Sequence, residues 1–243
     1  EYGERGLHGP ISNIPAEIES VIQPDPINGK MNLSITGVMK QSRALGTRLE
    51  LRRTISGKIG EAAIHIHDTV TNKGNTIAPH MLLYHCNFGW PLIDEGARLI
   101  WDGAWKAREP NPRIFREGND FRKCSAPLDE HSGGGEEAAF IDIASDSNGE
   151  SVCGIYNEKV GLAVRLRFLK SQLPWLTNWQ HWGKGEYVTG MEPGTHPPTG
   201  QATARKQGTL IELAPGETKD YELHIEILHQ PEQMADFIKP NNQ

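Results

Sequence analysis

Strict alternation of apolar and polar residues marks three segments of the chain. In residues 47–55, Leu49 and Leu51 alternate with charged and hydroxyl side chains, so one face of the segment is apolar and the other is polar. Residues 163–168 and 221–227 repeat this pattern. A period of two is typical of antiparallel strands with one face on a core and the other in water. The three segments are therefore predicted to be half-buried antiparallel strands.

Shorter apolar runs predict further strands, and turn signals such as residues 72–75 and 215–216 separate them. Residues 231–238 alone predict a helix, because Pro231 opens the segment and Glu232 lies in its first turn. About a dozen strands without alternating helices favour a large antiparallel sandwich or barrel. We expect one domain over residues 1–243, all-β with one short C-terminal helix. The further predicted strands are residues 17–22, 31–40, 62–70, 80–86, 97–101, 138–144, 152–156, 187–191 and 209–213.

Glycine and proline are frequent along the whole chain. The 243 residues include 26 Gly and 16 Pro, which leaves little room for long helices. Residues 105–137 lack any periodicity and contain three consecutive glycines at 133–135. This stretch is predicted to be a long loop, and long loops in compact domains often bind ligands or close over sites.

The net charge argues against some classes of binding partner. The chain carries 25 Lys and Arg against 31 Asp and Glu, a net charge of −6, which argues against a nucleic-acid footprint or a basic membrane face. No apolar run approaches the roughly 18 residues of a membrane helix. Cys86, Cys124 and Cys153 contain no CxxC pair and fit a reducing compartment, so a cytoplasmic location is expected. Residues 1–10 read like the middle of a loop, and we expect an N-terminal part with further strands to be missing.

Two of the ten histidines form a candidate metal motif. His65 and His67 lie two residues apart on a predicted strand, so both imidazoles share a face and could bind a metal. A cupin-type site also needs a carboxylate about four residues later, where Thr71 and Asn72 stand. Two polar residues on a solvated face is therefore the favoured interpretation.

Two other regions combine groups that suit sugar chemistry. His85 ends an apolar strand and is followed by aromatic residues and Gly, a setting that could present an imidazole to a pocket, although on spacing alone a structural histidine is the favoured interpretation. Three of the six tryptophans lie within residues 175–182, and flat indole faces suit the C–H face of a sugar ring. Glu192 leads into a loop rich in Pro and Gly, where a partly desolvated carboxylate can act as a base. Core tryptophans and an ordinary loop carboxylate are the alternative.

Three short motifs resemble those of the aldose 1-epimerase (galactose mutarotase) superfamily, in the family's order. Pro79, His85 and Phe88 are similar to a motif in which Pro precedes NLTNHxYFNL. Residues 7–9 are similar to the early HG motif, and residues 190–193 are similar to the late LETQxxPDA motif. The signatures LHGxISNxPAE, LYHxNFGWPL and MEPGTxPPTG point to a DUF4432-like branch of that superfamily, and they are matched by residues 7–17, 83–92 and 191–200.

The resemblance implies a galactose mutarotase-like supersandwich that acts on a small sugar without a cofactor. It implies that His85 is the general acid, Glu192 the general base and His8 a sugar-binding residue. Glu192 would take the proton of the anomeric hydroxyl while His85 protonates the ring oxygen; the ring opens, the C1–C2 bond turns, and closure gives the other anomer. Further substrate contacts are expected from Asn87, Trp179, Trp182 and His196.

The chain also departs from the family pattern. Before the acid, Met81 and Leu83 stand where the family has polar residues, and Ser12 stands where bacterial members often have Arg. These departures put the substrate contacts in doubt.

Two alternatives to anomer exchange remain open. His196 has no counterpart in the mutarotase motif, and with His8, His85 and Glu192 it could bind Mn²⁺ or Zn²⁺ for an isomerisation through an enediolate. A non-catalytic carbohydrate-binding domain is the third hypothesis, although both acid and base positions are filled. Fold similarity alone does not choose among them.

Overall fold

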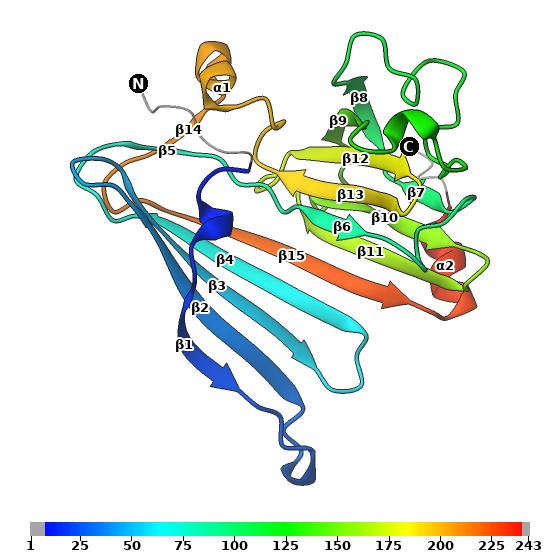
Figure 1. The fold of residues 1–243 in the computed structure, drawn as a ribbon. Helices are drawn as coiled ribbons and strands as arrows, with labels where there is room; N and C mark the ends of the chain where they lie inside the picture. The colour runs from blue at the N-terminus through cyan, green and yellow to red at the C-terminus, as the bar shows by residue number, and fades with distance from the viewer. Residues whose placement is uncertain (1–7, 240–243) are drawn as a thin grey trace. The chain divides into compact units, whose positions relative to one another are not determined.

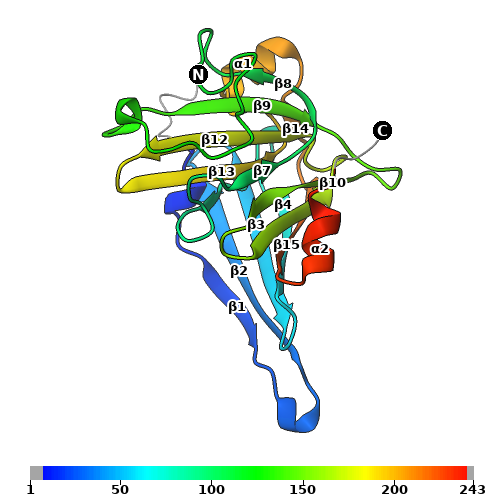
Figure 2. The same ribbon diagram turned by 90° about the vertical axis from the view of Figure 1, so that its right-hand side faces the viewer.

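The computed structural model describes residues 8–239, which form two compact units. The first unit takes the chain as far as His80 together with Gly208–Leu223, and the second takes Met81–Gln207 and the chain from His224 onward. Figures 1 and 2 show the elements of both units. The single domain expected over residues 1–243 stays a prediction.

The first unit is built on an antiparallel sheet. One face carries hydroxyl pairs such as Thr36 and Thr54, whose oxygens lie 2.9 Å apart. The other face carries the ion pair of Arg53 and Asp68, in which the Asp68 side chain is fully buried. The strands of the unit, in sheet order, are β1 (Glu17–Ile22), β2 (Asn32–Ser42), β3 (Arg48–Lys58), β4 (Ala63–Asn72) and the beginning of β15 (Thr218–Leu228). A two-stranded sheet of β5 (Ala78–His80) and β14 (Ile211–Leu213) and the 3₁₀ turns η1 (Ile11–Asn13) and η2 (Pro26–Asn28) complete it.

The second unit contains two antiparallel sheets that form a sandwich (Figure 2). One sheet has the order β6 (Cys86–Phe88), β13 (Glu186–Gly194), β12 (Trp175–Gly183), β9 (Glu137–Ile143) and β8 (Gly103–Ala107). The other continues from the end of β15 through β11 (Leu162–Leu169) and β10 (Glu150–Asn157) to β7 (Arg98–Ile100). The remaining elements are η3 (Asp129–His131), α1 (Gln201–Gln207) and α2 (Pro231–Phe237). Neither described helix has the length or apolar character needed to cross a membrane.

Both sheets of the second unit contribute to its core. Leu176 of β12 lies opposite Ile141 of β9, and both side chains are fully buried. Ile155 of β10 and Leu166 of β11 are also fully buried. Because successive side chains of a strand point to opposite faces, residues next to this core layer, such as Thr177, lie on the other face of the five-stranded sheet. That face carries the candidate site.

The predicted all-β antiparallel sandwich and the C-terminal helix are confirmed, with differences in detail. Residues 80–86 do not form one strand, because His80 ends β5 and Cys86 begins β6. Strands β8 and β12 were not predicted; β12 is buried on both faces over most of its length, which removes the alternation that marks a half-buried strand. Helix α1 was also missed, since Ala204 is its one buried residue and no apolar stripe results.

Candidate functional site

The pairing of two chain segments places His85 opposite Glu192. Leu82 exchanges hydrogen bonds with Thr195, Leu83 forms a bridge with Gly194, and further along Cys86 pairs with Met191. In each of these pairs the two residue numbers add up to 277. The same register places His85 opposite Glu192. Directly opposite residues of an antiparallel pair lie on the same face with their Cβ atoms about 5 Å apart. The local register thus brings the two predicted catalytic side chains together.

The two side chains are in direct contact. His85 Nε2 lies 3.2 Å from Glu192 Oε1. The other ring nitrogen, Nδ1, lies 2.8 Å from Asn87 Oδ1. A carbonyl oxygen only accepts hydrogen bonds, so Nδ1 carries a proton and Nε2 is left to exchange a proton with Glu192 or a substrate. Asn87, which we expected to bind substrate, orients the imidazole here.

Glu192 is a buried carboxyl group with an unusual proton affinity. Burial raises its pKa from the ordinary 4.5 to about 8; the nearby charge of Glu136 adds to this rise and Arg108 opposes it. Its Oε1 atom is buried and accepts no hydrogen bond from the described residues. An unsatisfied buried oxygen costs about 1–3 kcal/mol. A ligand hydroxyl that donates to Oε1 would relieve this cost.

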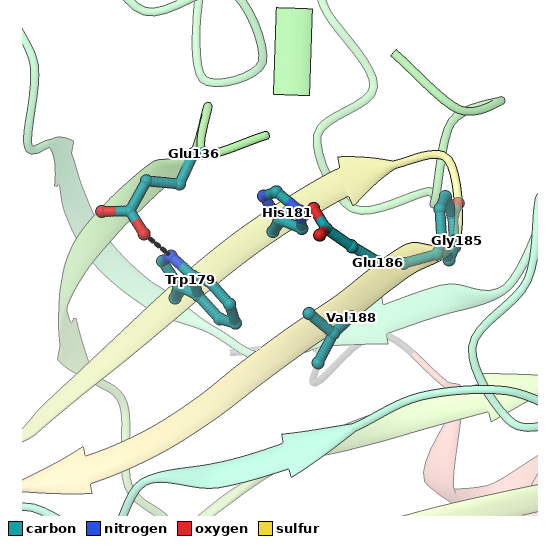
Figure 3. A pocket seen from close by; sticks show the side chains of 8 residues that line it. Glu136, Trp179, His181, Gly185, Glu186 and Val188 are labelled. Carbon is teal, nitrogen blue, oxygen red and sulfur yellow. Dashed lines mark hydrogen bonds and ion pairs between the residues drawn. The ribbon is translucent and has the colours of Figure 1, made fainter. Parts of the chain in front are cut away.

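Trp179 of β12 lies beside the His85–Glu192 pair and forms one wall of a cavity. Its ring centroid lies 6.0 Å from that of His85, edge to face, and 6.0 Å from that of His181, with which it is stacked. Trp179 and His181 line a cavity of about 430 Å³ that is widely open to solvent and whose other walls include Glu136, Glu186 and Val188 (Figure 3). His85 and Glu192 lie beyond Trp179 and are not among the residues that line this cavity. A volume of this size suits a small ligand, and a partly exposed indole face suits a sugar ring.

Three groups of this region were not assigned to the site from the sequence. Glu136 lies in the long loop that precedes β9 and accepts a hydrogen bond from the Trp179 indole. Arg108 follows β8 and donates to Glu136. His181 shares a face with Trp179, and its Nδ1 lies 2.5 Å from the carbonyl oxygen of Gly135. The predicted long loop was the available signal for the first two, but nothing in its sequence showed which residues reach the sheet.

Trp182 corrects one expectation. It was predicted to contact the sugar, but its side chain has no exposed surface, and it lies on the face of β12 opposite Trp179. Its indole N–H donates to Gln180 Oε1, and Gln180 in turn donates to Asn178 Oδ1. Asn178 donates to the carbonyl oxygen of Gly190. Trp182 is thus a core residue. It belongs to a series of buried hydrogen bonds on the face of β12 that is turned away from the site.

The two remaining predicted histidines have other surroundings. His8 belongs to the first unit, where it is exposed with φ +65°. His196 is buried in the second unit, with Nδ1 2.8 Å from Thr195 Oγ1. Over the described residues of the second unit, His85, Glu192 and His196 do not bring one ligand atom each within 4.8 Å of one another. The histidine–carboxylate metal set suggested by the sequence therefore lacks converging ligands in this unit.

Comparison with protein families identifies the family to which the chain belongs. The sequence profile described as a domain of unknown function, DUF4432, matches residues 1–227. The chain belongs to the DUF4432 family. No curated protein matches the chain.

Comparison with solved structures identifies the fold of this DUF4432 chain. A proposed aldose 1-epimerase from Klebsiella pneumoniae superposes with a TM-score of 0.82 at 24% identity, over 97% of this chain and 62% of that protein. A galactose mutarotase-like protein from Clostridium acetobutylicum gives 0.63 at 15% identity, over 92% and 69%. A second proposed aldose 1-epimerase, from Escherichia coli, gives 0.60 at 16% identity, over 88% and 69%. At these identities the likeness establishes a galactose mutarotase-like fold for this DUF4432 chain.

Proposed function

We propose that this DUF4432 protein is a carbohydrate-active enzyme that interconverts the anomers of an aldose by acid–base ring opening. One observation carries the proposal: His85 Nε2 and Glu192 Oε1 lie 3.2 Å apart, at the side of a partly exposed tryptophan. Two proton-transfer groups on one face are what anomer exchange requires, because one proton leaves the anomeric hydroxyl and another reaches the ring oxygen. The fold shared with mutarotase-like proteins supports the proposal by analogy.

The proposed reaction uses groups of this chain alone. The sugar ring packs on Trp179, and its anomeric hydroxyl donates to the unsatisfied Oε1 of Glu192. Glu192 takes that proton while protonated His85 delivers one from Nε2 to the ring oxygen, so the C1–O bond breaks and an open-chain aldehyde forms. After rotation about C1–C2, the reverse proton transfers close the ring on the other face of the aldehyde.

The protonation of the pair fits this cycle. His85 and Glu192 together can hold one proton, as an imidazolium beside a carboxylate or as a neutral imidazole beside a carboxylic acid. Burial of Glu192 favours its acid form in the empty site, as its raised pKa indicates. A hydroxyl that donates to Oε1 favours the carboxylate. Substrate binding thus shifts the pair toward the form in which Glu192 is the base.

The experiment follows anomer exchange by two-dimensional exchange NMR across a panel of aldoses. We expect Glu192→Gln and His85→Asn each to lower the catalysed rate at least a hundredfold, a typical loss for a general acid or base. Glu158→Gln, an exposed change in the turn between β10 and β11, is the matched control and should retain the rate. Catalysed exchange that is equal in the wild type and both site variants would refute the proposal.

The same assay separates the two alternatives. A metal-assisted isomerase would lose its activity after treatment with a chelator and regain it with Mn²⁺ or Zn²⁺, and it would convert an aldose into a ketose or an epimer at C2. A carbohydrate-binding domain would bind sugars without accelerating any exchange. We expect chelator-treated protein to exchange anomers at the untreated rate, with no new sugar formed.

A further inference from the structure

Glu136 connects Trp179, which lines the cavity, to the guanidinium group of Arg108. Its Oε2 accepts a hydrogen bond of 2.6 Å from the Trp179 indole nitrogen (Figure 3). Its Oε1 accepts one of 2.8 Å from Arg108. Both oxygens of the carboxylate are therefore engaged. Arg108 also donates to Glu109, at 3.0 Å. The network ties the chain after β8 and the chain before β9 to a side chain of β12.

The hydrogen bond to Glu136 fixes the orientation of the indole. Trp179 is stacked on His181 with an interplanar angle of 8°, and its ring meets that of His85 at 62°. His181 is itself held by Gly135 and stacked on the buried ring of His131. Trp179 is thus held at its nitrogen by Glu136 and along one ring face by His181, while it lines the cavity.

Glu136 also keeps a negative charge close to Glu192. Burial alone would raise the pKa of Glu136, but hydrogen bonds from Trp179 and Arg108 outweigh burial and hold the pKa below its ordinary value. Glu136 therefore stays ionised near neutral pH. Its charge raises the pKa of Glu192, whereas Arg108 lowers it.

We propose that Glu136 is a positioning residue of the candidate site, which fixes the Trp179 ring and, with Arg108, sets the charge that acts on Glu192. This inference rests on the proposed function for its role in catalysis. In the described part of the chain, the charged or titratable groups that act on Glu192 are His85 before β6, Arg108 after β8 and Glu136 before β9. Glu136 hydrogen-bonds both to Trp179, a wall of the cavity, and to the counter-charge of Arg108.

Two substitutions separate the two parts of this role. Glu136→Gln keeps an oxygen that can accept from the indole but removes the charge, so it should lower the pKa of Glu192 and leave Trp179 in place. Glu136→Ala removes both the charge and the acceptor, so it should also release the ring. Glu109→Gln removes a carboxylate that contacts Arg108 but not Trp179, and it serves as the control.

The experiment reads both effects directly by NMR on the whole chain, with or without catalysis. The ¹³C signal of the Glu192 carboxyl, titrated with pH, should move its midpoint down by about half a unit or more in Glu136→Gln and Glu136→Ala, and by much less in Glu109→Gln. The indole ¹H–¹⁵N signal of Trp179 should shift strongly in Glu136→Ala alone. An unchanged Glu192 midpoint in both Glu136 variants, or an unmoved indole signal in Glu136→Ala, would overturn the inference.

Kinetics then distinguish this inference from the proposed function. If the wild type exchanges anomers, the pH profile of kcat/KM should move toward lower pH in Glu136→Gln with little change in KM, and KM should rise severalfold in Glu136→Ala. A wild type without exchange activity refutes the proposed function, and the NMR shifts still decide the role of Glu136. A normal pH profile and KM in both Glu136 variants would contradict the role in catalysis.

Discussion

The carboxyl group of Glu192 fills the space above Gly190, two residues earlier on β13. A Cβ atom built on Gly190 would lie 2.2 Å from Glu192 Oε1, a distance that real Cβ atoms do not show. Side chains two apart on a strand share a face, so the glycine leaves room for the carboxyl group to lie back along its own strand. The position of Glu192 thus depends on the absence of a neighbouring side chain.

Gly190→Ala should displace the Glu192 carboxyl group and impair catalysis. We expect kcat/KM for anomer exchange to fall at least tenfold, because a small misplacement of a catalytic group is costly. The matched control is Gly89→Ala, just after β6, where the new Cβ would lie 3.8 Å from the nearest atom, an ordinary contact. Measurement of kcat/KM and of the melting temperature for both variants tests the prediction. A Gly190→Ala protein with wild-type kcat/KM would contradict it.

The pH dependence of the reaction should report the protonation of the His85–Glu192 pair. The pair is active in the form that holds one proton in total, so kcat/KM should fall as pH rises through the raised pKa of Glu192, about 8, where the pair loses that proton. A profile from pH 5 to 9 measures this, and we expect the falling limb above pH 8. A profile flat over this range would mean that loss of this proton does not affect the reaction.

Replacement of Glu192 should stabilise the protein, and more so at higher pH. The folded protein holds the Glu192 proton up to a pH of about 8, whereas the unfolded chain releases it near 4.5, so stability falls as pH rises between these values. The limiting slope is about 1.4 kcal/mol per pH unit. Between pH 5 and pH 8, Glu192→Gln should gain roughly 3–4 kcal/mol in unfolding free energy relative to wild type.

Urea unfolding of both proteins at the two pH values provides the measurement. Glu158→Gln, an exposed change in a turn of the same unit, controls for the loss of one carboxylate. Its difference from wild type should stay constant between pH 5 and pH 8. An equally constant difference for Glu192→Gln would show that the carboxyl group is not held protonated by burial.

The sequence analysis named the two residues of the proposed acid–base pair but only part of their surroundings. His85 and Glu192 were named from motifs, and the structure brings them together through a register that pairs residues 82–84 with the end of β13. That register could not be derived beforehand, because these residues were assigned to a single strand running to residue 86. The contacts of Glu136 and Arg108 were not predicted because they depend on where a long irregular loop meets the sheet. Irregular backbone carries no period from which such a meeting point can be deduced.

The tryptophans show the limit of composition as a guide to function. Trp179 and Trp182 lie three residues apart in one aromatic segment, and both were expected to contact a sugar. A strand turns alternate side chains to opposite faces, so an odd separation puts one at the cavity and the other in the core. Strand β12 was not recognised as a strand, and the odd separation therefore could not be used. Secondary structure had to be known before the two residues could be told apart.

Substitutions at these two positions should have opposite signatures. Trp179→Ala removes the wall of the cavity, so KM for the sugar should rise roughly tenfold, equivalent to about 1.4 kcal/mol, while the melting temperature changes little. Trp182→Phe leaves a void in the core and the Gln180 oxygen without its donor, so it should cost about 1–3 kcal/mol of stability with KM unchanged. Each variant serves as the control for the other, with KM from exchange kinetics and stability from thermal unfolding. A rise of KM in folded Trp182→Phe, or a wild-type KM in Trp179→Ala, would show that the sugar does not pack on the exposed face of β12.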